Sequence, residues 1–280
     1  GESFSIADPK EVWILEMIGK GPGERGAVWV AQKLPEGTIC SHANQARIRT
    51  FKRNDPENSL FSEDVVDFAR KKNLYPKNAA DEDFSFSDTF APMTFGGARW
   101  CEARVWAFFR HAGATGMDDY LSYVQGYDLT HRMPLFVKPA QKLKVSDTMA
   151  FMRDHFEGTW LAMDKDVGAG AFEMPYRWRP LDWTVDNKKY ANERSVGTQQ
   201  TGWSFVAQMR EWLPREIGGK LWFGVDDTAS SVYTPYYGSM TDVPETWAEG
   251  NGNMMNFTFN SAFWAFNMVS NFGYTRYNII

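Results

Sequence analysis

The first third of the chain alternates short apolar runs with turn-forming residues, a pattern typical of an antiparallel meander. Asp8-Pro9-Lys10 and Pro35-Glu36-Gly37 are turns by composition, and residues 19–23 are rich in glycine. Connections this short favour antiparallel pairing, because a parallel crossover needs about a dozen residues or more. Four runs are predicted to be strands, at residues 3–7, 12–18, 27–34 and 38–42.

Helical spacing follows in the middle of the chain. One helix is predicted from Val65, after Ser62-Glu63-Asp64, and a second over 98–111, closed by Gly113. A third is predicted to be capped by Ser146 or Asp147 and to end at Gly158. Later come two predicted strands and an apolar helix that is expected to lie in the core, at residues 220–225, 231–237 and 262–269. Strands, then helices, then strands again indicate an α+β fold with layered antiparallel sheets.

Composition narrows the class of protein. The chain has 280 residues, of which 43% are hydrophobic and 16% aromatic, enough for one large domain or a domain with a sizeable insertion. Its formal net charge of -5 provides no basic surface for nucleic acid. No run approaches the roughly 20 apolar residues of a membrane helix. We therefore expect neither a nucleic-acid partner nor a membrane span.

Metal and thiol chemistry have little support in the sequence. The two cysteines, Cys40 and Cys101, stand outside any CxxC pattern, and both are expected to be small core residues, although a bridge between them is not excluded by the count alone. No two of the four histidines have the spacing of a metal-binding motif. We expect no metal and no cofactor.

Six segments, in order along nearly the whole chain, together resemble the C69 dipeptidases, a family that includes the secernins. The first is a strand pair with the residues Ser-Phe-Ser-Ile-Ala-Asp-Pro and Glu-Val-Trp-Ile-Leu-Glu. One such match would be weak, but six in sequence order make the resemblance specific. The six segments are residues 3–16, 41–45, 98–106, 153–159, 198–204 and 221–227.

The resemblance implies a fold and a chemistry. The implied fold is the four-layer αββα sandwich of N-terminal-nucleophile hydrolases, with residues 1–280 forming part of a single such domain that carries a helical insertion. The implied nucleophile is a cysteine that processing makes N-terminal, and its own α-amino group, which titrates near pH 8, handles the proton. Residue 1 is glycine. The nucleophile is therefore expected in an upstream segment, and this chain alone is expected to be inactive.

The function implied is hydrolysis of dipeptides or related small amides. Two alternatives remain: an amidase of the penicillin V acylase or bile-salt hydrolase kind, and a non-catalytic binding protein on the same scaffold. The expected partners are the substrate, the upstream segment and further copies of the chain in a homo-oligomer. Cytoplasmic and exported locations both stay open.

Asn44 and Arg99 are the predicted catalytic residues in this chain. An asparagine amide can stabilise a tetrahedral oxyanion, which contributes about 3 to 4 kcal/mol to lowering the barrier. The alternative for Asn44 is a structural turn. Arg99 could orient the thiolate or bind a substrate carboxylate, with Arg104 as its competitor, or it could be a surface residue paired with Glu102.

Four further residues are predicted to bind substrate. His42 lies two residues from Asn44 and is expected to line the same pocket. Asp226 and Asp227 follow a strand and could bind a substrate amino group, or they could form a turn. Gln199 could offer amide donors and acceptors, or it could have a purely structural role.

Overall fold

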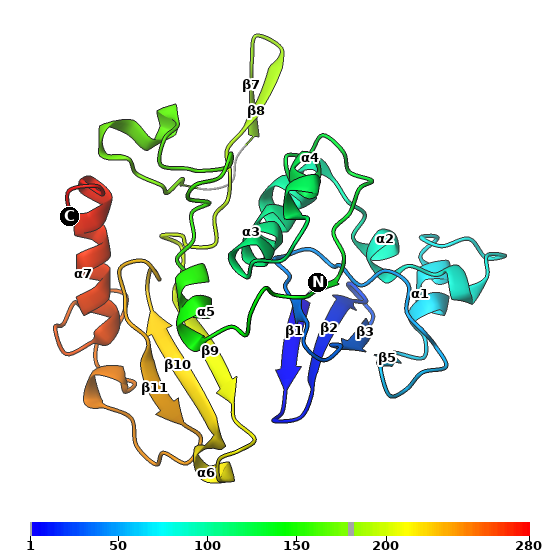
Figure 1. The fold of residues 1–280 in the computed structure, drawn as a ribbon, viewed down its shortest axis with the longest axis horizontal. Coiled ribbons are helices and arrows are strands. Elements are labelled where there is room, and N and C mark those ends of the chain that lie inside the picture. Colours follow the sequence, from blue (N-terminus) through cyan, green and yellow to red (C-terminus); the bar gives the residue numbers. More distant parts are fainter. Residues whose placement is uncertain (1, 179–181) are drawn as a thin grey trace. The chain divides into compact units, whose positions relative to one another are not determined.

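The protein divides into two compact units, residues 1–142 and residues 143–280. We describe it from a computed structural model, which covers residues 2–178 and 182–280 (Figure 1). Each unit combines helices with antiparallel sheets, so the predicted α+β class is confirmed. That all 280 residues are part of one domain stays a prediction.

The main sheet of the first unit contains the predicted meander. Its strand order is β1-β2-β3-β5, all antiparallel. The strands are β1 (Glu2–Ala7), β2 (Val12–Gly19), β3 (Ala27–Lys33) and β5 (Ser59–Phe61). The predicted strands 3–7, 12–18 and 27–34 are thereby confirmed.

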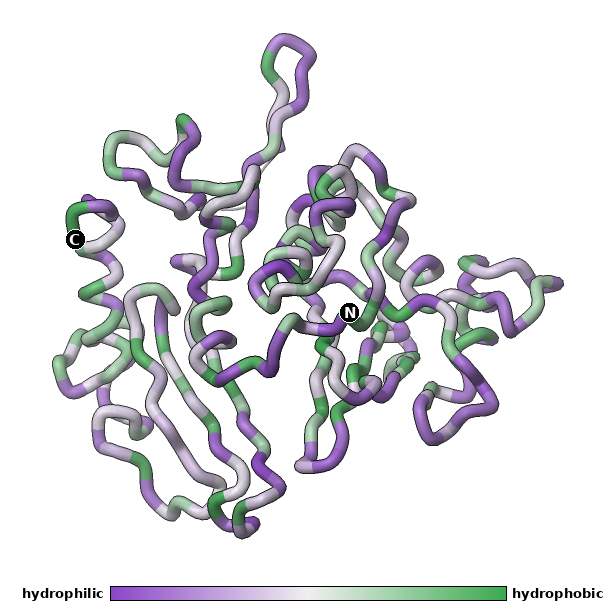
Figure 2. Tube along the Cα trace, viewed as in Figure 1, coloured by the Kyte–Doolittle hydropathy of each residue, from purple (hydrophilic) through white to green (hydrophobic). Residues whose placement is uncertain are grey.

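Side-chain alternation places one face of this sheet against the core. Ile14 of β2 and Val28 and Val30 of β3 are fully buried there. They belong to a core cluster with helix α1 (Val65–Lys71), whose start at Val65 was predicted, and with Phe86 of the short helix α2 (Phe86–Phe90). Figure 2 shows hydrophobic residues concentrated on β2 and β3, and the segment 50–58 that leads into β5 as hydrophilic.

The strand predicted at 38–42 is wrong in length. Strand β4 covers only Ile39–Cys40 and pairs with β6 (Phe136–Val137). Directly after β4, the carbonyl of Ser41 accepts a hydrogen bond from the Arg47 side chain rather than from a strand partner.

The predicted helix at 98–111 is present, but its first part is wider than expected. Residues Gly97–Glu102 form a π-helix and α3 (Ala103–His111) continues it. Such π segments occur frequently at functional sites. Gly113 follows with φ 70°, as predicted for a C-terminal glycine. A 3₁₀ turn (Met117–Tyr120) and α4 (Leu121–Val124) complete this helical part.

The second unit is built on a three-stranded sheet in the order β11-β10-β9. Helices α5 and α7 contact β9 and β10, respectively. A separate hairpin, β7–β8, projects from this unit (Figure 1). The elements are α5 (Val145–Phe151), a 3₁₀ helix (Val167–Phe172), β7 (Asp182–Val185), β8 (Lys188–Ala191), β9 (Trp203–Met209), α6 (Arg215–Gly218), β10 (Gly219–Val225), β11 (Thr234–Tyr237), a 3₁₀ turn (Glu245–Trp247) and α7 (Ala262–Thr275). The strands predicted at 220–225 and 231–237 are present, the second shortened.

Helix α5 ends seven residues before the predicted Gly158. Phe156 has a left-handed backbone, with φ 65°, and its N–H bonds to the Asp154 carboxylate rather than to a helical carbonyl. Asp147 does support the start of the helix, because its Oδ2 accepts the backbone N–H of Lys144 at 2.8 Å.

The expectation that residues 262–269 lie in the core is wrong. Within α7 only Ala262 and Ser270 are buried, while Val269 is 48% and Phe272 63% exposed. The physical reason is that only one side of the helix packs on the sheet. Over the described residues, none of the helices has the length and apolar character needed to cross a bilayer.

Candidate functional site

Two segments of the first unit form what we call the loop–helix site, residues 41–48 and 97–104. The loop is anchored by Glu16 of strand β2, and the Glu16 side chain is only 1% exposed. Its carboxylate accepts the backbone N–H groups of Arg47 at 2.7 Å and Ile48 at 3.0 Å. A buried acid on the sheet therefore fixes the backbone of the loop at Arg47 and Ile48.

Arg47 connects the loop to the helix. Its buried guanidinium lies 2.9 Å from the Glu102 carboxylate, and it also donates to the carbonyls of Ser41 at 3.0 Å and Pro134 at 2.9 Å. Tyr123 donates to the same carboxylate at 3.2 Å. Because a buried ion pair needs such additional hydrogen bonds, this network favours one conformation of the loop.

Burial changes the protonation of two groups at this site. It raises the pKa of Glu16 to about 7, although the N–H groups of Arg47 and Ile48 act in the opposite direction. Burial, together with the positive charge of Arg47, lowers the pKa of His42 to about 4. His42 is therefore neutral rather than cationic at neutral pH.

Asn44 lies exposed at the tip of the loop, with a left-handed backbone at φ 60°. Its Oδ1 accepts a hydrogen bond from Nη2 of Arg104 at 3.0 Å. Arg104 also donates to the carbonyl of Ala43 at 3.3 Å and to that of Trp100 at 2.8 Å. The guanidinium thus joins the tip of the loop to the helix.

The loop and the start of the helix are in close contact. A Cβ on Gly97 would lie 2.9 Å from Oε1 of Gln45 and 3.0 Å from Sδ of Met93. Gln45 also donates to the carbonyl of Ala91 at 2.5 Å. Residue 97 therefore has to be glycine for the loop to pack at this distance.

Arg99 and Arg104 point to different partners. Arg99 is 9% exposed and donates to the carbonyl of Gln125 at 3.4 Å. Arg104, the competing candidate from the sequence, contacts Asn44. The structure brings Asn44 together with Arg104, and the predicted role of Arg99 stays a prediction.

Cys40 and Cys101 are both half-buried. Burial raises the pKa of the Cys40 thiol to about 12, so this thiol stays protonated at neutral pH. Cys40 packs against the core cluster, as expected. Cys101 lies in the π-helix.

Asp226 and Asp227 lie in the second unit, after β10, and both are buried. Asp227 accepts hydrogen bonds from the hydroxyls of Tyr176 at 2.5 Å and Tyr274 at 3.1 Å. Asp226 accepts from the hydroxyl of Ser270 at 2.6 Å, and its left-handed backbone, φ 65°, forms the turn. Both carboxylates are therefore occupied by internal donors.

Gln199 is also engaged within the second unit. Its Nε2 donates to the carbonyl of Arg177 at 2.7 Å, and its Oε1 accepts from the Thr198 hydroxyl at 3.1 Å. The cavity beside it has a volume of about 10 Å³, which is room for a single water molecule.

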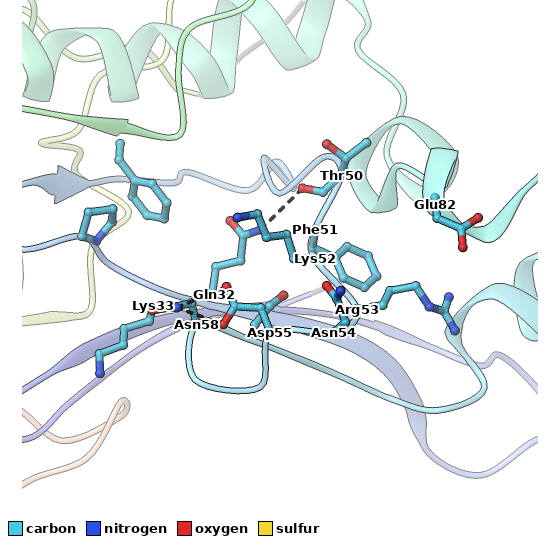
Figure 3. A pocket seen from close by; sticks show the side chains of 13 residues that line it. Gln32, Lys33, Thr50, Phe51, Lys52, Arg53, Asn54, Asp55, Asn58 and Glu82 are labelled. Carbon is cyan, nitrogen blue, oxygen red and sulfur yellow. Dashed lines mark hydrogen bonds between the residues drawn. The ribbon is translucent and has the colours of Figure 1, made fainter.

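A larger open pocket of about 950 Å³ lies elsewhere in the first unit (Figure 3). Its lining consists of the end of β3, Pro35, residues 50–55, 58 and 59, Glu82 and Phe136, and it includes none of the predicted site residues. Charges of both signs face it, with Lys33 and Arg53 toward opposite ends and Asp55 between them. Residues 50–58, which supply much of its lining, are polar except for Phe51 and Pro56.

No group of three or more histidine, cysteine or acidic side chains that could hold a metal ion occurs in residues 2–178 or 182–280.

Comparison with known proteins adds the observation that decides the family: the sequence profile of peptidase family C69 matches residues 1–280. The chain belongs to peptidase family C69. The resemblance seen in the sequence is thereby confirmed.

Curated relatives of this C69 chain are named dipeptidases. A probable dipeptidase of Salmonella dublin is 28% identical over 242 residues, covering 86% of this chain and 48% of the relative. Dipeptidase A of Lactobacillus helveticus is 23% identical over 280 residues, covering 99% and 50%, respectively. A probable dipeptidase of Latilactobacillus sakei is 23% identical over 264 residues, covering 94% and 48%. The chain spans about half the length of these relatives.

The C69 segments noted in the sequence correspond to defined parts of the structure. The first covers β1 and β2, with Glu16 at its end. The second and third, residues 41–45 and 98–106, form most of the loop–helix site. The last covers most of β10 and ends at Asp227.

Proposed function

We propose that the protein containing this chain hydrolyses dipeptides or related small amides through a cysteine nucleophile located outside residues 1–280. Membership of family C69 and three relatives named as dipeptidases support the reaction. Each relative is about twice as long as the matched chain, which leaves room for a further catalytic segment. The protonated thiol of Cys40 is a poor nucleophile, and this also favours a cysteine elsewhere.

The fold proposed is the αββα sandwich of N-terminal-nucleophile hydrolases, with this chain as part of a single domain that carries a helical insertion. The resemblance in sequence and the antiparallel sheets of both units support it. In such an enzyme the cysteine thiolate attacks the peptide carbonyl, and the carbonyl oxygen becomes an oxyanion that needs fixed hydrogen-bond donors.

Asn44 is the donor proposed for that oxyanion. One observation carries this role: its side chain is exposed at the tip of a loop whose base is anchored by buried Glu16 and Arg47. A donor held this way needs little reorganisation when charge develops on the substrate. His42, neutral at neutral pH, suits a hydrogen-bonding role in the same pocket.

The other predicted residues receive less support. Arg99 remains a proposed site residue through its place in the same helix, where it donates a hydrogen bond to the carbonyl of Gln125. For Asp226, Asp227 and Gln199, the hydrogen bonds described above favour structural roles over substrate binding.

The experiment that tests this proposal is mass spectrometry of the complete natural protein after alkylation with iodoacetamide. We expect loss of dipeptide hydrolysis to follow modification of one N-terminal cysteine outside this chain. The double variant Cys40→Ser/Cys101→Ser serves as the control and should keep its activity and the same sensitivity to alkylation. Inactivation that maps to Cys40 or Cys101, or no inactivation at all, would overturn the proposed nucleophile.

A further inference from the structure

We infer that Arg104 is a positioning residue that fixes the side-chain amide of Asn44, so that its Nδ2 group faces the substrate and its Oδ1 atom does not. The inference rests on the proposed function, because it concerns how Asn44 would serve an oxyanion. It is carried by the contacts of Arg104 with three groups on the two segments of the loop–helix site.

The chemistry of an asparagine amide makes this orientation important. The group carries a donor at Nδ2 and an acceptor at Oδ1, and the two ends are nearly identical in shape. Rotation by half a turn would place the oxygen where the nitrogen should be. A donor stabilises a developing oxyanion, whereas an acceptor at the same position repels it.

Arginine can impose one of the two orientations because it only donates. Its guanidinium has five N–H groups and no acceptor, so the amide atom that faces it must be the oxygen. The 3.0 Å contact from Nη2 of Arg104 to Oδ1 of Asn44 satisfies this requirement. Since the two amide ends share one plane, occupying Oδ1 leaves Nδ2 as the end presented elsewhere.

The guanidinium is itself held at two other points. Its Nε donates to the carbonyl of Trp100 at 2.8 Å, one turn earlier in the helix. Its Nη2 also lies 3.3 Å from the carbonyl of Ala43, next to Asn44 in the loop. An arginine fixed by several hydrogen bonds presents its donors in one geometry, which the flexible ammonium of lysine does not reproduce.

Other contacts hold the backbone of the loop, so rotation of the Asn44 amide is the main motion that remains. The backbone of Asn44 is in the left-handed region, φ 60°, which asparagine tolerates better than most residues. Glu16 and Arg47 hold the end of the loop inside the core. Rotation of the exposed side chain is therefore the step that Arg104 restricts.

A double-mutant cycle in the complete natural enzyme tests this inference. The variants are Arg104→Met, Arg104→Lys, Asn44→Ala and the double Asn44→Ala/Arg104→Met, with kcat and KM measured on one dipeptide. We expect Arg104→Met to lower kcat about tenfold with KM within about twofold, because the interaction acts in the transition state. Arg104→Lys should recover part of this loss. In the Asn44→Ala background, Arg104→Met should have no further effect on kcat.

Two controls separate positioning from general damage. Arg110→Met removes an exposed arginine of the same helix that pairs with Asp118, and it should leave kcat unchanged. The rate of iodoacetamide alkylation of the nucleophile should be the same in Arg104→Met and in the wild type, since the inferred role does not involve the thiol.

The outcomes distinguish this inference from the proposed function. If Arg104→Met lowers kcat equally with and without Asn44, or if Arg104→Lys and Arg104→Met both keep full kcat while Asn44→Ala loses it, the positioning role of Arg104 is refuted and the role of Asn44 stands. If Asn44→Ala keeps full kcat, the proposed oxyanion role is refuted, and this inference falls with it.

Discussion

Asn44 and the pair Asp226–Asp227 look alike in the sequence, since each is a polar group that follows a predicted strand. Their surroundings in the structure are opposite. Asn44 is exposed and has one amide end occupied by Arg104, whereas both acids are buried and accept hydrogen bonds from hydroxyl groups within their unit. A group that is to bind substrate must keep hydrogen-bonding capacity directed at the solvent, and Asn44 does so while the acids do not.

The two places also differ in which side chains are buried. At the loop–helix site, the buried ionisable side chains belong to neighbours of Asn44, chiefly Glu16, Arg47 and Glu102, and they hold the loop. In the second unit Asp227 itself is the buried side chain, and the hydroxyls of Tyr176 and Tyr274 donate hydrogen bonds to it. The difference predicts that substitutions at the acids act mainly on stability and those at Asn44 mainly on turnover.

The largest effect on stability is expected for Asp227→Ala. The change removes a buried carboxylate and leaves the hydroxyls of Tyr176 and Tyr274 without their acceptor. Unpaired buried groups of this kind cost about 1–3 kcal/mol each, so the free energy of unfolding should fall by about 3–5 kcal/mol in a urea titration. Asp242→Ala, at an exposed position, is the matched control and should stay within about 0.5 kcal/mol. Equal stability of the two variants would contradict the structural role of Asp227.

The next effect concerns the pH dependence of stability through Glu16. Its pKa is raised by burial from 4.5 to about 7, so the folded protein favours the protonated form. The stability that this provides is complete below about pH 4.5 and is lost as the pH rises through about 7. The full change is roughly 3 kcal/mol. Glu16→Gln cannot ionise, so its free energy of unfolding should vary less between pH 5 and pH 8 than that of the wild type. An unchanged pH profile would show that Glu16 does not titrate in this range.

A smaller effect is expected for Gly97→Ala at the contact between loop and helix. The added Cβ would meet Gln45 and Met93 at about 3 Å, and the loop that carries Asn44 would have to move. Overpacking of this kind costs about 1–3 kcal/mol. Gly273→Ala in α7, where a Cβ meets nothing within 4 Å, is the control and should stabilise by up to about 1 kcal/mol. If thermal melting gives the two variants the same sign, the close approach at Gly97 is not needed.

Local patterns were sufficient for the parts of the fold that depend on neighbours in sequence. The strands β1 to β3 and the start of α1 at Val65 follow from alternation, turns and capping. The exposure of α7 could not be predicted, because it depends on packing against a strand that is distant in sequence. Nor could the contact directly after α5, where the carbonyl of Met152 accepts a hydrogen bond from the hydroxyl of Thr228. The hairpin β7–β8 was missed although its turn, Asp186-Asn187 with both φ values positive, suits a tight hairpin.

The candidate site was predicted in part for the same reason. The sequence indicates Asn44, but its partner Arg104 lies 60 residues away, and the sequence alone offers it only as the alternative to Arg99. The two arginines share one helix, and only the direction of each side chain distinguishes them. The occupation of Asp227 by Tyr176 and Tyr274, 51 and 47 residues distant, was equally invisible to local patterns.

The most direct test of the account is the turnover of one dipeptide by Asn44→Ala and Asp226→Asn variants of the complete enzyme, each corrected for the folded fraction. We predict that Asn44→Ala lowers kcat by about 10²-fold or more, as removal of an oxyanion donor does, while its melting temperature stays close to that of the wild type. Asp226→Asn should keep its kcat and lose stability. Full turnover by Asn44→Ala, together with loss of turnover by a folded Asp226→Asn, would contradict the account and move the functional site to the acids.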